Sequence, residues 1–220
     1  MKDIKVKIGL TGVVHPNMPG DDEGVYAGII KSMELLQADL DFDLAVLPDP
    51  LRSEADGEAA RKFLDDRQVD LTLIFNASLG YGRVILPLAR VKSYIGLWSV
   101  PEPTRDGVLQ LNSFCGLNMY GSIISNYLTL HRIPFKWFYG YTDAPMVEER
   151  FKITLAALRA IKVLQRSRIG QIGGLADGFE NIYIDERELE KKFGTQLQTR
   201  HTVEDIVALN FRSFVRIKMQ

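Results

Sequence analysis

The chain has 220 residues, of which 46% are apolar and 25% are charged, a composition typical of globular proteins. Its formal net charge of −1 at pH 7 lacks the basic excess of a nucleic-acid-binding protein, so we expect no nucleic-acid partner. No apolar run is long enough to span a bilayer, and the sequence enters a strand without a signal peptide. We therefore expect no membrane partner and a cytoplasmic location.

Apolar runs typical of strands alternate with segments of helical periodicity up to residue 165. We expect strands at residues 5–14, 42–47, 69–75, 94–98 and 135–139. We expect helices at residues 25–40, 53–68, 82–91, 117–130 and 146–165, with Ser53 as the N-cap of the second. Five βα units in succession predict a parallel sheet with helices on both faces. Right-handed crossovers then favour an α/β fold with a flavodoxin-like, doubly wound sheet.

A new pattern begins at residue 168 with the glycine-rich segment RIGQIGG. The expected elements are a strand, a helix, a strand and a helix, at residues 168–174, 186–193, 196–201 and 203–214. This order predicts the start of a second Rossmann-like α/β domain. We therefore divide the chain into a flavodoxin-like domain at 1–166 and a partial α/β domain at 167–220. Because two strands do not form an independently stable sheet, we expect the natural architecture to continue beyond this chain.

In an open parallel sheet, ligands bind beyond the carboxyl ends of the strands, where the strand order reverses. This rule selects the connections at residues 15–24, 76–82 and 99–116. In the first, His15 and Asn17 are candidate ligand contacts, whereas the acids at 21–23 favour capping of the next helix over a metal site. The second, NASLGYG, lacks the complete phosphate-binding patterns, and we interpret it as a tight turn.

The connection after the fourth expected strand carries most of the candidate contacts. It is longer than usual for an α/β unit, and such connections are usually functional or disordered. Trp98 is placed to lie flat against the C–H face of a sugar while other side chains bond its hydroxyl groups, namely Arg105, Asn112, Ser113 and Asn118. The alternative is that Trp98 belongs to the core and that Asn112 or Ser113 only caps the next helix. The connection favours a small, polar, uncharged ligand.

The remaining residues that often carry chemistry are interpreted as structural. The single cysteine, Cys115, excludes internal disulfides and cysteine-based metal clusters, and no histidine stands in an evident position to activate it. His131 is expected at a helix end, where a cation is favoured, and His201 is expected in a strand. The glycines of RIGQIGG do not hold the spacing of a dinucleotide-binding turn.

Four segments occur in a recognisable order: IGLTGVV with a polar loop after it, LWSVPEP, LNSFCGLNMYGSIISNY, and RIGQIGG followed by FENIYIDERELEKKFG. In this order the chain resembles the N-terminal half of the L-fucose and L-arabinose isomerase family, over essentially its whole length. The resemblance implies interconversion of aldoses and ketoses. It also implies a divalent metal, usually Mn²⁺, held by two carboxylates and a histidine.

The resemblance implies further that those metal ligands lie in a C-terminal half that this chain lacks. We therefore expect this chain to bind no metal and to have no isomerase turnover by itself. In the family, the N-terminal domain covers the active site of a neighbour in a homo-oligomer, a trimer or hexamer, and supplies substrate contacts. Trp98, Asn112 and Ser113 fall in the matching segments. The arabinose branch has a glutamine and a histidine in this neighbourhood, whereas this chain has Ser113 and Gly116, which argues against arabinose as the substrate.

Three functions stay open on this evidence. The first is the substrate-covering and oligomerising part of a sugar ketol-isomerase. The second is a non-catalytic sugar-binding or regulatory module, which a closed two-lobed monomer would favour. The third is a flavodoxin-like binder of a nucleotide or flavin, which a basic or glycine-lined phosphate cradle would favour.

Overall fold

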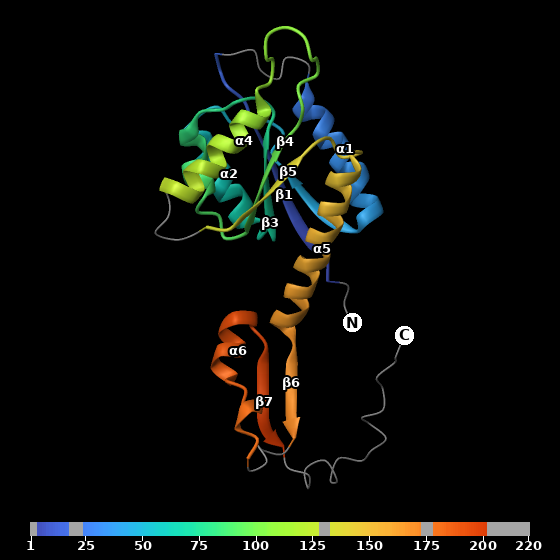
Figure 1. The fold of residues 1–220 in the computed structure, drawn as a ribbon, viewed down its shortest axis with the longest axis vertical. Coiled ribbons are helices and arrows are strands. Elements are labelled where there is room, and N and C mark those ends of the chain that lie inside the picture. The colour runs from blue at the N-terminus through green and yellow to red at the C-terminus, as the bar shows by residue number, and fades with distance from the viewer. Residues whose placement is uncertain (1–3, 18–23, 128–132, 173–177, 202–220) are drawn as a thin grey trace. The chain divides into compact units, whose positions relative to one another are not determined.

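The computed structural model describes residues 4–17, 24–127, 133–172 and 178–201 (Figure 1). It separates into two compact units, Met1–Leu158 and Arg159–Gln220, and each is described by itself. The division falls within the long helix that ends at Arg166, whereas the sequence analysis put the boundary at the end of that helix. Within the described residues, no helix combines the length and the apolar character needed to cross a membrane.

The first unit alternates strands and helices. Its strands are β1 (Val6–Val13), β2 (Phe42–Val46), β3 (Leu71–Asn76), β4 (Tyr94–Ser99) and β5 (Phe135–Tyr139). Its helices are α1 (Val25–Leu40), α2 (Glu54–Asp66), the 3₁₀ turn η1 (Gly82–Val84), α3 (Ile85–Leu88), α4 (Ser113–Ser122), the π-helical turn η2 (Ile123–Tyr127) and α5 (Pro145–Arg166). All neighbouring strands are parallel, in the order β2-β1-β3-β4-β5. This confirms the predicted α/β fold with a flavodoxin-like sheet.

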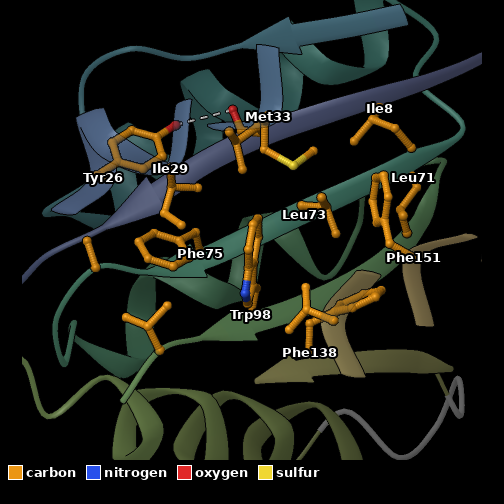
Figure 2. Packing of buried hydrophobic residues seen from close by; sticks show 14 of the residues in the cluster. Ile8, Tyr26, Ile29, Met33, Leu71, Leu73, Phe75, Trp98, Phe138 and Phe151 are labelled. Atoms are coloured by element: carbon orange, nitrogen blue, oxygen red, sulfur yellow. Dashed lines mark hydrogen bonds between the residues drawn. The ribbon is translucent and has the colours of Figure 1, made fainter. Parts of the chain in front are cut away.

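Helices cover both faces of this sheet. Helices α1 and α5 share one face, where a core cluster contains Tyr26, Ile29 and Met33 of α1, Phe151 of α5 and strand residues such as Leu73, Phe75 and Phe138 (Figure 2). On the other face, α2, α3 and α4 bury Ala60, Leu64, Ile85, Leu88, Leu117 and Tyr120. The central strand β3, LTLIFN, is buried at every position, which is why it is mostly apolar, with only Thr72 and Asn76 as polar residues.

The helix limits confirm one sequence prediction and correct two. Ser53 caps α2 as expected: its hydroxyl accepts the N–H of Asp56 (3.2 Å), and the Asp56 carboxylate accepts the N–H of Ser53 (2.9 Å). The helix expected at 82–91 is shorter, because it consists only of η1 and α3. The helix expected from residue 117 begins four residues earlier, at 113, after Asn112 in the left-handed region (φ 49°).

The second unit contains β6 (Arg168–Ile172), η4 (Glu180–Ile182), α6 (Glu186–Phe193) and β7 (Gln196–His201). The two strands pair in parallel, as a βαβ unit requires. Asp185 caps α6 by accepting the N–H groups of Arg187 (2.9 Å) and Glu188 (3.1 Å), and Gly194 ends it in the left-handed region. The glycines at 173 and 174 and the helix expected at 203–214 lie outside the described residues, so the prediction of a further Rossmann-like domain stays a prediction.

Candidate functional site

The strand order reverses between β1 and β3, and the ends of these strands are tied together by hydrogen bonds. The N–H of Ser78 donates to the carbonyl of Val13 (3.1 Å), and the Ser78 hydroxyl accepts the N–H of His15 (3.1 Å). The N–H of Leu79 donates to the carbonyl of Leu111, at 2.8 Å, in the connection after β4. The three connections selected from the sequence therefore meet at one edge of the sheet, as the crevice rule predicts.

His15 is half-buried at this edge, beside Tyr81. Their ring centroids lie 4.4 Å apart with the planes tilted by 55°. The Nδ1 atom of His15 accepts the N–H of Asn17 (3.0 Å), so a neutral imidazole carries its proton on Nε2 and presents a donor there. Tyr81 is held in turn, because its carbonyl accepts the buried hydroxyl of Tyr120 (3.1 Å). Asn17 contributes its backbone to this arrangement, and its side chain is exposed.

Trp98 is a core residue, and this corrects the expectation that its indole lies open to a ligand. Only 2% of its surface is exposed. Its ring lies edge-on to Phe75, with centroids 5.3 Å apart, and Figure 2 shows it beside Phe138 as well. The indole N–H donates to the carbonyl of Gly140 (2.8 Å). The structure therefore agrees with the alternative interpretation of the sequence, that Trp98 belongs to the core.

Ser113 is also enclosed. It lies in the first turn of α4, fully buried, where its hydroxyl donates to the carbonyl of Asn76 and accepts the N–H of Val100 (3.1 Å). The hydroxyl thereby joins the ends of β3 and β4 to α4. In this position Ser113 is a structural link and not an open donor to a sugar.

Glu102 lies in the connection after β4, was not among the ligand contacts expected from the sequence, and organises this connection. Its carboxylate accepts three successive backbone N–H groups, those of Gln110 (2.9 Å), Leu111 (3.0 Å) and Asn112 (2.6 Å). The connection is therefore folded back on its own start. Its partners lie eight to ten residues away along the chain in an irregular segment, so no local sequence pattern identifies them.

A cavity of about 390 Å³ opens where this connection meets α4 and β5. Its lining includes two of the predicted contacts, Asn112 and Asn118, together with the aromatic pair Phe114 and Tyr139, whose centroids lie 5.1 Å apart. Asn118 donates through Nδ2 to the carbonyl of Phe114 (3.1 Å), which leaves its amide oxygen as an acceptor. Arg105 is exposed in the same connection but is not part of this lining.

A larger cavity, of about 980 Å³, lies on the other side of α4. It is a groove between the start of α2, η1 and the side of α4 and η2, lined by Arg52, Ser53, Glu54, Tyr81, Gly82, Arg83, Leu86, Met119, Ser122 and Ile123. Tyr81 joins it to the His15 cluster, because the Tyr81 ring contacts His15. We did not identify this groove from the sequence, because it is built from three stretches that are far apart in the chain, at residues 52–54, 81–86 and 119–123.

Neither cavity holds a recognisable metal centre. Among residues 4–17, 24–127, 133–172 and 178–201, no three histidine, cysteine, aspartate or glutamate side chains gather so as to hold a metal ion. The described residues thus do not fit the two carboxylates and one histidine that the resemblance implies. Cys115 lies exposed beside the smaller cavity, His131 lies outside the described residues, and His201 lies in β7. That Mn²⁺ is bound elsewhere in a larger protein stays a prediction.

No protein-family model matches the chain. It is similar to curated proteins named sulfoquinovose isomerase from Priestia aryabhattai and Priestia megaterium, each 29% identical over 171 residues, which is 76% of this chain and 36% of the relative. A protein of the same name from Alkalicoccus urumqiensis is 33% identical over 103 residues, which is 47% of this chain and 22% of the relative. The chain thus spans about a third or less of the length of these relatives. Their name supports the resemblance at the level of sugar isomerases, and not the fucose or arabinose branch.

Proposed function

We propose that this chain is the N-terminal part of a sugar isomerase that interconverts an aldose and a ketose, with sulfoquinovose, a sulfonated hexose, as its substrate. The similarity to three proteins of that name is the observation that carries the proposal. The parallel sheet supports it as well, because its carboxyl edge is the usual location of a ligand crevice in this architecture.

In this proposal the chain binds and orients the sugar, and the rest of the protein supplies the chemistry. Moving a proton between adjacent sugar carbons needs a base near the carbon and an electrophile on the carbonyl oxygen. The described residues gather no metal-binding group. We therefore assign the Mn²⁺ ligands to sequence outside this chain, and the carboxyl edge of the sheet to contact with a neighbouring subunit in a homo-oligomer.

The proposed sugar contacts come from the edge where β1 and β3 end. The Nε2–H of His15 can donate to a hydroxyl group, and the Tyr81 ring beside it provides an aromatic surface, the combination that sugar sites commonly use. The smaller cavity, with Asn112 and Asn118, is the second candidate location, because its amides and aromatic rings are suited to the hydroxyl groups and the C–H face of a sugar ring.

The test uses the product of the complete open reading frame that contains these 220 residues, incubated with sulfoquinovose and Mn²⁺. Proton NMR should detect conversion of the aldose into a ketose, and the 220-residue chain alone should give none. Binding of the sugar without turnover by the complete product would favour a non-catalytic sugar-binding module instead. If the complete product neither binds nor converts the sugar, the proposal is refuted.

Two sets of variants distinguish the candidate locations. If the sugar lies at the first, His15→Ala should raise the KM for the sugar about tenfold, the loss of one hydrogen bond in a confined site. The double variant N112A/N118A should then leave the KM within about twofold of wild type. An unchanged KM in His15→Ala together with a raised KM in N112A/N118A would place the sugar in the smaller cavity.

A further inference from the structure

The larger cavity exists because the connection between β3 and β4 contains almost no helix. It provides only the three residues of η1 and the four of α3, where a βα unit usually has a helix that spans the sheet. The surface between α2 and α4 is therefore left as a groove, with Leu86, Met119 and Ile123 as its apolar lining. Its volume of about 980 Å³ suits a small molecule.

Close packing fixes the two sides of this groove relative to one another. Gly57 of α2 lies against η1, where a β-carbon would stand only 2.7 Å from the carbonyl oxygen of Val84. The segment that leads into α2 is also fixed, by the capping box of Ser53 and Asp56. Arg52 and Arg83, which line the groove from these two elements, therefore have firmly placed backbones.

The two arginines have hydrogen-bond donors to spare. Arg52 uses Nη1 to donate to the carbonyl of Pro50 (3.0 Å), and a guanidinium group has five N–H donors. Within the part of the chain that the structure describes, the Arg83 side chain makes no hydrogen bond or ion pair. The groove contains one carboxylate, that of Glu54, so its lining has an excess of positive charge. An oxyanion is the ligand group that guanidinium groups bind best.

We propose that Arg52 and Arg83 bind the sulfonate group of a sulfonated sugar and select it over the uncharged sugar. This inference rests on the proposed function, because it assigns a specificity site to the same substrate. Tyr81 lines the groove and contacts His15, so the sugar ring and the sulfonate occupy adjoining positions at one edge of the sheet. The sulfonate is fully ionised at neutral pH. Both arginines keep their positive charge there, so each contact joins opposite charges.

The experiment compares R52Q, R83Q and the double variant of the complete product with R90Q as the control. Arg90 is exposed and belongs to the same region, but it does not line the groove. The KM for sulfoquinovose should rise about tenfold for each groove variant and about a hundredfold for the double variant, whereas R90Q should match wild type. Methanesulfonate, used as a probe of the anion alone, should inhibit wild type competitively and inhibit the double variant far less.

The outcomes separate the inference from the proposed function. An active enzyme whose KM for sulfoquinovose is unchanged in R52Q/R83Q would overturn the inference and leave the function standing. If wild type does not convert sulfoquinovose, the proposed function fails, and the site is then judged by NMR titration of the 220-residue chain with methanesulfonate and with inorganic sulfate. Shifts that methanesulfonate or sulfate causes around Arg83, and that R52Q/R83Q abolishes, would support an anion site. Their absence would refute one.

Discussion

Glu102 offers the sharpest test of how the connection after β4 is held. Its carboxylate accepts three backbone N–H groups, at 2.6 to 3.0 Å, from Gln110, Leu111 and Asn112. Glu102→Ala removes all three bonds at once. Each is worth roughly 1 kcal/mol net, and water can replace part of the loss because the site is only partly buried. We therefore expect the free energy of unfolding to fall by about 1–3 kcal/mol.

The assay is urea denaturation, combined with hydrogen exchange of the three amides. The transition midpoint should fall while its slope stays constant, because the variant exposes no additional surface on unfolding. The amides at 110–112 should exchange faster than in wild type. Asp106→Ala is the matched control, because Asp106 is exposed in the same connection and its side chain is not one of these acceptors. Unchanged midpoint and unchanged exchange in Glu102→Ala would refute this account of the connection.

Two further changes test other parts of the structure. Trp98→Phe should destabilise the protein by about 2 kcal/mol, because it removes buried volume and leaves the carbonyl of Gly140 without its donor. The substitution should not alter the affinity for the sugar. A change in affinity without a loss of stability would contradict the assignment of Trp98 to the core. The backbone N–H of Arg52, followed by the side chain and backbone of Ser53, lowers the pKa of Asp56 in the folded state, so its stabilising effect is present above the ordinary pKa of an aspartate and is lost as the pH falls through the lowered value. Asp56→Asn should therefore be less stable than wild type at pH 7, by about 1 kcal/mol, and this difference should shrink as the pH falls through the lowered pKa of Asp56, as thermal unfolding over a series of pH values from 7 downward would measure.

The sheet was predictable because the local residue pattern of each strand and of most helices identifies it. A strand buried on both faces, such as β3, is mostly apolar, and right-handed crossovers leave few ways to arrange five such strands. The cap of α2 was predictable for the same reason, because Ser53 and Asp56 are three residues apart and bond to each other's backbone.

The candidate site was less predictable because its contacts are distant in sequence. The sequence places Trp98 at the end of a strand but does not tell which neighbour its indole meets, and the partner carbonyl lies 42 residues further on. The groove depends on how short the β3–β4 helices are, and the expected helix at 82–91 would have filled part of that space. Pro87 was the available signal, since a proline is disfavoured inside a helix.

The two cavities have different origins, and their linings differ in charge. Helices α1 and α5 lie on one face of the sheet, and α3 and α4 lie on the other. The connections that follow neighbouring strands therefore run to opposite faces at two places, between β1 and β3 and between β4 and β5. The smaller cavity lies at the second of these places, where β4 and β5 end. No lysine or arginine belongs to its described lining, and its one carboxylate, that of Glu102, already accepts backbone N–H groups. An uncharged sugar suits it. A sulfonated sugar needs a cation, and of the two cavities only the larger, with Arg52 and Arg83, provides one within the described residues.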